Sequence, residues 1–440
     1  MKFYILKLGC PKNDVDADYL AARLIAEGHQ PVVRPEDAET VIVNTCGFIR
    51  PAKEESINEI LRMNLLKKEG IIKKLFATGC LTQRYGDELY RNLPELDGAF
   101  GLGEIEAVMS AMTQTSKNPE TIRTLASRLD YLSGKERFIG DDLPYAYLKI
   151  SDGCNRVCSF CAIPNIRGRY RSRPPEEIIE EAAFLADNGK KELIIVSQEA
   201  TLYGHDLKRG LDIVKLLEAL DKIEKVQWIR LLYLYPNKVS DELIDYMASD
   251  NKTLKYFDLP LQHINDEILK KMKRHTTRRA TEALLDKIRN RIPEATLRTA
   301  FIVGFPGETD KRYKELKDFI ETSCFDRLGV FAFSPEEGTV AYDLKSRVSQ
   351  KVTQTRLDEL MSLQQEIAFG KNNLLIGQLK KVIIDRIGEN GTGVGRTEAD
   401  CPEIDQEVFI RGNILAPGDI ITARITAVDG YDLEGKIHEG

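Results

Sequence analysis

The sequence predicts an α/β protein with an N-terminal parallel-sheet domain, a central partial, TIM-like (β/α) barrel and a small antiparallel β-barrel at the C-terminal end. Strand and helix patterns alternate through roughly the first hundred residues, and six further strand patterns separated by helical patterns follow from Tyr145. Helical periodicity ends near Asn373, where short strand patterns and Gly-rich turns follow. Alternating strands and helices are typical of parallel sheets, whereas short strands alone indicate a small barrel. We expect domains over 1–118, 138–371 and 372–440, with a polar linker over 119–137.

Each of three strand patterns in the N-terminal domain ends at a cysteine. These patterns cover 3–10, ending at Cys10, 40–46, ending at Cys46, and 74–80, ending at Cys80. Helical patterns follow them at 13–28, 51–69 and about 83–93. Ligands bind beyond the carboxyl ends of parallel strands, so we expect the three thiols to converge in one crevice. The alternative is three small buried residues, because free cysteine is often buried.

The six strand patterns of the central region lead into loops rich in Gly, Pro and polar residues. They cover 145–151, 192–198, 226–234, 254–260, 296–304 and 327–334. Helical patterns such as 174–189 and 276–292 separate them. In (β/α) barrels the chemistry lies at the carboxyl ends of the strands. We therefore expect the site at loops that read SDGC, SQEA, LPLQH and GFPGE.

The last 68 residues read as a small β-barrel. Strand patterns cover 379–387, 407–412, 419–430 and 431–437, and GENGTGVG (388–395) reads as a Gly-rich turn. Such spacing of short strands and turns is typical of a barrel. The helical pattern at 356–373 is expected to link it to the central region.

Three of the eight cysteines lie within one short segment of the central region. Cys154, Cys158 and Cys161 form a C-x3-C-x2-C motif directly after the first strand pattern of the barrel. Three thiolates on a short loop can bind three irons of a cubane cluster and leave the fourth iron open. The alternatives are a zinc site or three unrelated thiols. Cys324 and Cys401 match no ligand pattern, so we expect ordinary thiols there.

This spacing resembles the hallmark of the radical S-adenosylmethionine (SAM) superfamily. The resemblance implies a [4Fe–4S] cluster on Cys154, Cys158 and Cys161, whose open iron chelates SAM and cleaves it to a 5′-deoxyadenosyl radical. It also implies SAM contacts at strand ends and in the GFPGE turn. The candidates are Phe160, Ser197, Gln198, Glu199, Arg230, Arg298, Gly304, Pro306, Gly307 and Glu308. An ordinary turn or salt-bridge role is the alternative for each.

Over essentially the whole chain the sequence resembles the methylthiotransferase family. The motifs LGCPKN, NTCGFI and TGCLTQRY carry this resemblance together with the C-x3-C-x2-C loop. It implies an α/β domain, a radical SAM barrel and a TRAM β-barrel, in that order. It also implies a second [4Fe–4S] cluster on Cys10, Cys46 and Cys80, whose open iron carries sulfur or methylsulfide. SAM then serves as methyl donor and as radical source.

Two substrate branches exist in that family, and the motifs resemble one more closely. One branch modifies an adenosine of tRNA, and the other modifies an aspartate of a small-subunit ribosomal protein. LGCPKNDVD, LPLQHIND and TEADCPEIDQEVFI look like the second branch. The tRNA branch typically has Gln-Met-Asn after the first cysteine, where this chain has Pro11, Lys12 and Asn13. A non-catalytic Fe–S or RNA-binding scaffold is a third hypothesis.

Charge gives a separate argument about the partner. The segment 373–440 contains seven basic and twelve acidic residues, a net charge of −5 in a chain of net charge −6. RNA affinity comes mainly from Lys and Arg that neutralise phosphates, so an acidic barrel favours a basic ribosomal protein, free or on the assembled small subunit. A merely solvated acidic surface is the alternative. The basic stretches 166–173 and 270–279 could hold substrate acids or ribosomal RNA, or be solvated faces.

Location and further partners follow from the same features. No run of about 18 apolar residues occurs, and the N-terminus lacks the apolar core of a signal peptide, so we expect a cytoplasmic protein without a membrane span. Clustered cysteines in a reducing compartment favour metal binding over disulfides. The family resemblance also implies an external electron donor and an external sulfur source.

Overall fold

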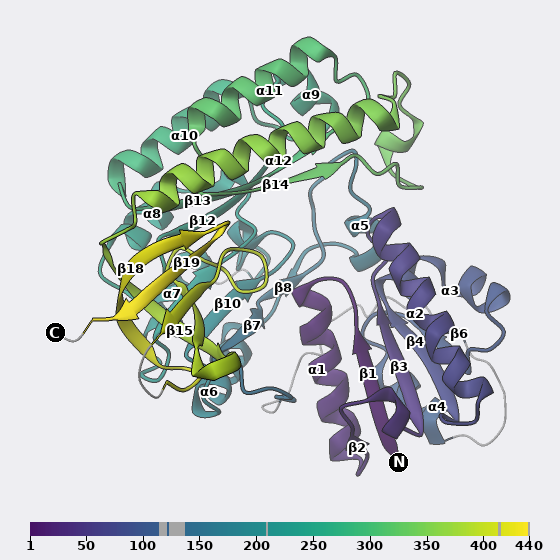
Figure 1. Ribbon diagram of the computed structural model, residues 1–440. Coiled ribbons are helices and arrows are strands. Elements are labelled where there is room, and N and C mark those ends of the chain that lie inside the picture. Colours follow the sequence, from purple (N-terminus) through teal and green to yellow (C-terminus); the bar gives the residue numbers. More distant parts are fainter. Residues whose placement is uncertain (114–120, 123–136, 208–209, 412–414, 439–440) are drawn as a thin grey trace.

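The computed structural model describes residues 1–113, 121–122, 137–207, 210–411 and 415–438. A parallel-sheet domain and a small barrel flank a central barrel-like body (Figure 1). This architecture confirms the predicted fold class. The domain boundaries stay a prediction, and the linker expected over 119–137 lies outside the described residues apart from 121–122 and 137.

The N-terminal domain is a parallel sheet of order β2-β1-β3-β4-β5-β6. The expected strands are present, and β2, β5 and β6 were not predicted because two or three residues give no readable alternation. The elements are β1 (Lys2–Lys7), α1 (Pro11–Ala26), β2 (Gln30–Pro31), β3 (Thr40–Thr45), α2 (Arg50–Lys68), β4 (Lys74–Gly79), α3 (Cys80–Asn92), β5 (Gly98–Phe100), α4 (Ile105–Thr113) and β6 (Thr121–Ile122).

The central body begins with a three-stranded parallel sheet of order β11-β10-β7. A short antiparallel pair, β8 with β9, carries the start of the cysteine loop. The elements are β7 (Tyr145–Lys149), β8 (Ser151–Asp152), α5 (Ile163–Arg167), β9 (Arg171–Ser172), α6 (Pro175–Asp187), β10 (Glu192–Val196), α7 (Ile213–Asp221), β11 (Trp228–Leu231) and α8 (Asp241–Ala248).

A second parallel sheet, of order β12-β13-β14, completes the central body. A single bridge from Ile229 to Thr253 joins the two sheets, so the barrel is split, in agreement with the expected partial barrel. The elements are β12 (Tyr256–Gln262), α9 (Asp266–Lys271), α10 (Arg278–Arg291), β13 (Thr296–Val303), α11 (Asp310–Ser323), β14 (Arg327–Ala332) and α12 (Gln350–Asn373).

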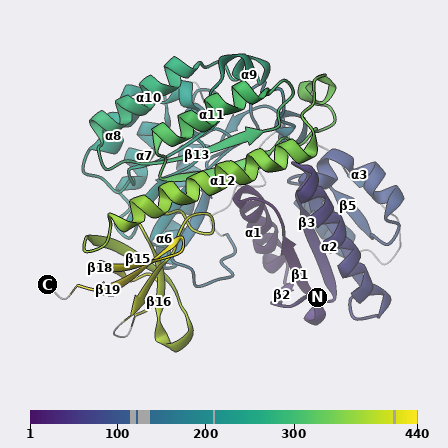
Figure 2. The ribbon, with the colours of Figure 1, turned by 45° about the horizontal axis from the view of Figure 1, so that its top comes forward.

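Helix α12 is more than a link between domains. It runs along the central body from the side of the N-terminal domain to the C-terminal barrel (Figure 2). Arg356, Leu360, Gln364 and Ala368 recur at helical spacing and are buried against that body. The helix therefore belongs to the outer layer of the central barrel.

The C-terminal domain is a closed barrel of order β15-β16-β17-β19-β18. It is antiparallel except for the parallel pair β17/β19. Its strands are β15 (Leu379–Ile387), β16 (Gly393–Thr397), β17 (Val408–Arg411), β18 (Ile420–Asp429) and β19 (Asp432–Ile437). The prediction of a Gly-rich turn over 388–395 was wrong for the second half of that segment, which is part of β16. A Cβ at Gly395 would lie 2.1 Å from the Ile383 carbonyl oxygen, so glycine serves close strand packing there.

One apolar cluster extends through all three parts of the molecule. It contains Phe3 and Tyr19 from the N-terminal domain, Trp228 from the barrel, and Ile383 and Cys401 from the C-terminal domain. Burial of apolar surface therefore holds the three parts together. Within the described ranges, no helix combines the length and apolarity that crossing a membrane requires.

Candidate functional site

The C-x3-C-x2-C loop follows β8 and is fixed by backbone hydrogen bonds. The N–H groups of Cys154 and Ser159 donate to backbone carbonyls at 3.1 and 3.0 Å. Gly153 has a φ of 77°, and a Cβ there would lie 2.2 Å from the Arg169 carbonyl oxygen. Only glycine fits that turn. The loop is therefore preorganised at the carboxyl end of the first barrel strand.

The three thiols of this loop are half-buried. Burial raises the pKa of Cys154 to about 11 and the pKa of Cys161 to about 12. An N–H of Arg274 lies 3.7 Å from the Cys158 sulfur. In the described part of the chain, no three Cys, His, Asp or Glu side chains surround a single metal ion. In a cubane cluster, each thiolate binds a different iron.

The second cysteine trio lies where three parallel strands end. Cys10 precedes α1, Cys80 begins α3, and Cys46 directly follows β3. A Cβ at Gly9 would lie 2.8 Å from the Cys46 sulfur, which places Cys46 beside the residue before Cys10. The positive end of α3 lies at Cys80, its first residue, and favours a thiolate there. Burial nevertheless raises the pKa of Cys80 to about 12, so an opposing positive partner is needed to hold its thiolate.

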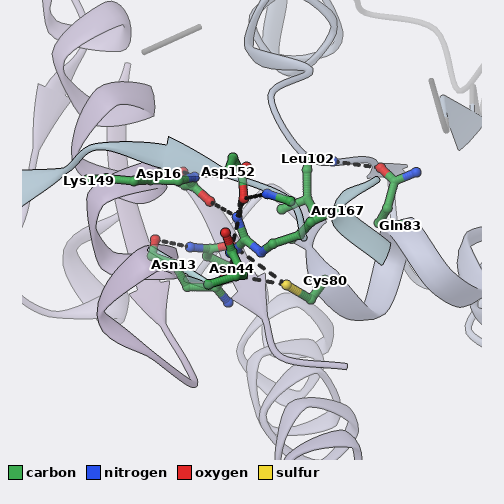
Figure 3. Close-up of polar contacts among 12 residues, drawn as sticks. Asn13, Asp16, Asn44, Cys80, Gln83, Leu102, Lys149, Asp152 and Arg167 are labelled. Carbon is green, nitrogen blue, oxygen red and sulfur yellow. Dashed lines mark hydrogen bonds and ion pairs between the residues drawn. The ribbon is translucent and has the colours of Figure 1, made fainter. Parts of the chain in front are cut away.

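Arg167, which follows Cys161 by six residues, supplies that partner at Cys80 (Figure 3). Its guanidinium donates to Asn13 Oδ1 at 2.6 Å and lies 3.4 Å from the Cys80 sulfur. Arg167 is 1% exposed. It ends α5, the helix that starts just after Cys161. A single side chain thus connects the cysteine loop to a thiol of the N-terminal domain.

Two carboxylates balance the cations of this junction. Asp16 and Asp152 accept from Arg167 at 3.0 and 3.1 Å, and from Lys149 at 2.6 and 3.0 Å. Burial opposes the charge on Arg167, but Asp152, Cys80 and Asp16 raise its pKa well above the usual value. Two cations and two carboxylates cancel, which is how buried charges are tolerated.

The end of β10 offers unsatisfied polar atoms beside the cysteine loop. The Ser197 hydroxyl and Gln198 Oε1 are buried without a hydrogen-bond partner among the described residues. Gln198 Nε2 donates to Asp152 at 3.0 Å. Buried polar atoms are usually paired, so these two fit a polar ligand such as the methionyl end of SAM. Glu199 forms a bidentate pair with Arg156 of the cysteine loop, which occupies its carboxylate.

The aromatic candidate and the GFPGE turn share one apolar cluster. Phe160 packs against a buried group that contains Phe305 of the turn. Gly304 has a φ of 77°, and a Cβ there would lie 2.2 Å from Thr353 Oγ1 of α12. Pro306 and Gly307 complete the turn, beside the aromatic face that an adenine ring would need.

Glu308 is committed to structure at the end of that turn. Its carboxylate accepts from the Gly304 N–H at 3.0 Å and from Arg356 of α12 at 2.7 Å. It is 3% exposed. The glutamate therefore anchors α12 to the turn and holds the turn's shape.

Arg230 and Arg298 point away from the cysteine loop, toward the C-terminal barrel. Arg230 is 0% exposed, pairs with Glu192 at 2.7 Å and donates to the Glu398 carbonyl oxygen at 3.1 Å. Arg298 pairs with Asp258 at 2.8 Å and lies 3.7 Å from Asp405. The alternative of a salt-bridge role, left open by the sequence, describes both arginines here.

Lys12 is a buried cation two residues after Cys10. It is 7% exposed, and its Nζ lies 3.5 Å from the centroid of the Tyr233 ring. Burial opposes its charge, but Tyr233 and Cys10 raise the pKa of Lys12 above its ordinary value. The ammonium therefore stays charged in the interior.

Three family profiles match the chain in order along the sequence. They are Uncharacterized protein family UPF0004 at 2–101, the Radical SAM superfamily at 148–320, and the TRAM domain at 376–437. The ribosomal protein uS12 methylthiotransferase RimO of Aquifex aeolicus is 44% identical over 99% of this chain and 97% of that protein. The RimO protein of Thermosipho africanus is 43% identical over 100% of both chains. The chain belongs to the uS12 methylthiotransferase family.

Membership of this methylthiotransferase family confirms the resemblance seen in the sequence. Structural neighbours of the uS12 methylthiotransferase chain support the radical SAM fold alone. The radical SAM methyltransferase TsrM of Kitasatospora setae matches with a TM-score of 0.54 at 15% identity, over 75% of this chain and 72% of that one. The cobalamin-dependent SAM radical enzyme OxsB matches with a TM-score of 0.51 at 12% identity, over 83% of this chain and 56% of that one. The superfamily implies one [4Fe–4S] cluster and SAM for residues 148–320.

Three site residues were not identified from the sequence. Arg167 and Arg274 lie within the basic stretches 166–173 and 270–279, which were interpreted only as substrate-binding or solvated. Both side chains are buried beside cysteine sulfurs. Lys12 was noted only as part of a motif. For Lys12 and Arg167 the available signal was a cation a few residues from a candidate ligand cysteine, because thiolates attract positive charge. Arg274 is 116 residues from Cys158 in sequence and gave no such signal.

The acidic charge of the C-terminal domain is partly used inside the protein. Asp385 pairs with Arg396 at 2.6 Å, and Asp400 pairs with Arg327. Glu403 accepts hydrogen bonds from Tyr145 and Tyr147 of the barrel. Part of the acidic charge counted over 373–440 is therefore used inside the protein, and only the remaining acidic residues can contribute to binding a basic partner.

Proposed function

We propose that this chain transfers a methylthio group to the β-carbon of an aspartate in ribosomal protein uS12. The observation that carries the proposal is the pair of cysteine trios, with Arg167, six residues after Cys161, beside the Cys80 sulfur across the domain junction. The named relatives, 40–44% identical over nearly the full chain, support this substrate. A ribosomal-protein substrate would place the reaction in the cytoplasm.

Two [4Fe–4S] clusters belong to this proposal. Cys154, Cys158 and Cys161 would hold the first, and Cys10, Cys46 and Cys80 would hold the second. The fit rests on the donor set, three thiols at each site with a guanidinium N–H near one sulfur. When bound, the clusters and SAM supply the radical, the sulfur and the methyl group. An external electron donor and an external sulfur source complete the cycle.

The chain's own residues position these groups. Ser197 and Gln198 would accept the methionyl end of SAM, and Phe160 with the turn at Gly304 and Pro306 would face its adenine. Glu199 and Glu308 would act through Arg156 and Arg356, which they orient. Because Arg167 and its carboxylates are buried, water is excluded from the junction, which protects a radical from side reactions.

Comparative mass spectrometry tests the proposal. In cells that lack the gene, uS12 should lose about 46 Da, the mass added when SCH3 replaces H in this cofactor chemistry. Restoring the gene should restore the mass, and a C154S variant should not. Loss of the same mass from a tRNA adenosine, with uS12 unchanged, would identify the other substrate branch. Reconstituted protein that binds both clusters but never releases 5′-deoxyadenosine from SAM would indicate a non-catalytic scaffold.

A further inference from the structure

The end of helix α9 packs against the C-x3-C-x2-C loop at three points. The Ser159 N–H donates to the Met272 carbonyl oxygen at 3.0 Å, and the Ser159 hydroxyl donates to the Lys271 carbonyl oxygen at 2.7 Å. An N–H of Arg274 lies 3.7 Å from the Cys158 sulfur. This segment belongs to the basic stretch 270–279, which has no role in the proposed function. It forms a wall of the site that would hold the first cluster.

Residues at the end of α9 alternate between the interior and the surface. Met272 and Arg274 are 0% and 4% exposed, whereas Lys271 and Lys273 are exposed. The buried residues of this segment touch the cysteine loop, and the residues between them meet solvent. Neighbouring residues of one segment therefore reach the Cys158 sulfur and the surface of the molecule. Electron transfer slows steeply with distance, so this is a favourable place for an electron to enter.

The backbone around Arg274 is held in an unusual shape. Lys273 and His275 have φ values of 55° and 49°, in the left-handed region that residues other than glycine seldom adopt. The Tyr235 hydroxyl donates to the Arg274 carbonyl oxygen at 2.6 Å, and Asn237 Nδ2 donates to the His275 carbonyl oxygen at 2.8 Å. Such conformations persist where the surrounding structure fixes them, often at functional sites. The loop after β11 thus keeps the Arg274 side chain pointing inward and its neighbours outward.

The exposed side of this segment is strongly basic. Residues 268–281 contain three lysines, three arginines and one histidine but no acidic residue, in a chain of net charge −6. Lys270, Lys271 and Lys273 are exposed, and they form no ion pair with any residue that the structure describes. Exposed cations of this kind attract an acidic partner and disfavour a basic one. A basic ribosomal protein is therefore a poor occupant of this face.

We propose that the surface formed by Lys270, Lys271 and Lys273 docks an acidic protein that delivers electrons to the first cluster. The inference rests on the proposed function, which needs an external electron donor. One electron leaves the reduced donor and enters the oxidised cluster, and no bond or proton is exchanged. The partner is a small acidic redox protein of low potential. Its complex with this chain is small and transient, as electron-transfer complexes usually are.

Reduction of the cluster-loaded protein in a stopped-flow instrument tests this surface. The probe is reduced plant-type ferredoxin, an acidic one-electron donor with a potential of about −400 mV. The variant is K270E/K273E; Lys271 is kept because its ammonium lies beside Gly307 of the GFPGE turn. At low salt, we expect the second-order rate constant with ferredoxin to fall about tenfold or more, because charge steering raises association rates by at least that factor. Dithionite, a small reductant, should give the same final paramagnetic signal and the same 5′-deoxyadenosine release in both proteins.

The matched control is K222E/K225E. It reverses two exposed lysines in the segment that leads into the amino end of β11, at the end of the barrel opposite the cysteine loop. The control should react with ferredoxin at the wild-type rate. Raising the salt concentration to about 0.5 M should bring the rates of all three proteins together, because salt screens exposed charges.

An equal ferredoxin rate in K270E/K273E and wild type at low salt would overturn the proposal. If that variant kept its ferredoxin rate but lost affinity for the small ribosomal subunit, the face would be a phosphate-binding surface instead. A weaker dithionite-reduced signal in the variant would also overturn it, because the lysines would then support the cluster itself. So would wild type that dithionite reduces and ferredoxin does not. Wild type without any cluster that dithionite can reduce would overturn the proposed function.

Discussion

Replacing Arg167 by glutamine removes one of two cations from a buried junction and leaves Asp16 and Asp152 with Lys149 alone. Arg167, Asp16 and Asp152 are 1%, 9% and 2% exposed, so solvent cannot screen the imbalance. Removing one partner of a buried pair costs about 3–5 kcal/mol. We expect R167Q to lose that much free energy of unfolding.

The same substitution removes the guanidinium that lies 3.4 Å from the Cys80 sulfur. A hydrogen bond to a charged group contributes about 1.5–3 kcal/mol. If the hydrogen bond is stronger in one oxidation state of the cluster by half of that energy, its loss shifts the reduction potential by about 30–60 mV for one electron. Loss of a cation disfavours the added electron. The reduction potential of the cluster proposed on Cys10, Cys46 and Cys80 should therefore fall in R167Q.

Arg173 provides a matched control, because it is 0% exposed and pairs with Glu181 at 2.6 Å. R173Q should lose comparable stability and leave the potential of the N-terminal cluster unchanged. Urea unfolding can be followed through the single tryptophan, Trp228, which lies in the shared apolar cluster. Redox titration with electron paramagnetic resonance reports the potential. An N-terminal potential in R167Q equal to that in R173Q would refute the role of Arg167 at Cys80, and R167K tests it further without deleting the charge.

Three other outcomes follow from the site and its surroundings. C80S should reduce bound iron from about eight to about four atoms per chain while 5′-deoxyadenosine release from SAM persists; loss of all iron would contradict independent cluster sites. Burial raises the pKa of Asp14 to about 6 from 3.8, so the folded state holds the Asp14 proton more tightly than the unfolded state does. Ionisation of Asp14 therefore lowers the free energy of unfolding. This loss is absent below about pH 4 and grows until about pH 6. D14N should therefore gain about 1–3 kcal/mol over wild type at pH 7 and nothing near pH 3.5 in urea unfolding, and an equal gain at both values would rule out titration as the cause. Arg396 pairs with Glu192 at 2.8 Å and Asp385 at 2.6 Å, so R396M should cost about 3–5 kcal/mol in the same assay, and a cost below about 1 kcal/mol would show that the pairs are not needed.

The sequence was sufficient for the fold class and for the convergence of ligand cysteines at strand ends. The strand patterns show that Cys10, Cys46 and Cys80 each lie at the carboxyl end of a strand. Parallel pairing brings these ends to the same edge of the sheet. Gly153 was equally readable, because a glycine before a ligand cysteine indicates a turn that only glycine can adopt. Local pattern and tertiary structure agree at these positions.

The partners of buried charges could not be predicted, because ion pairs form between segments far apart in sequence. Arg230 and Arg298 lie in strands that end near the site, yet their side chains meet the C-terminal domain. Arg167 was part of a basic stretch that resembled a solvated surface. The periodicity of a strand or helix predicts on which face of that element a side chain lies. It does not predict which charged residue packs against that side chain, because that depends on tertiary packing.

The same limitation changes how the substrate is inferred from charge. Net charge informs on partners only when the charges face solvent, whereas Asp385, Asp400 and Asp405 of the C-terminal domain are buried against arginines. The pairs of Asp400 with Arg327 and of Asp405 with Arg298 fasten the terminal barrel to the central one, which is a structural use of acidity.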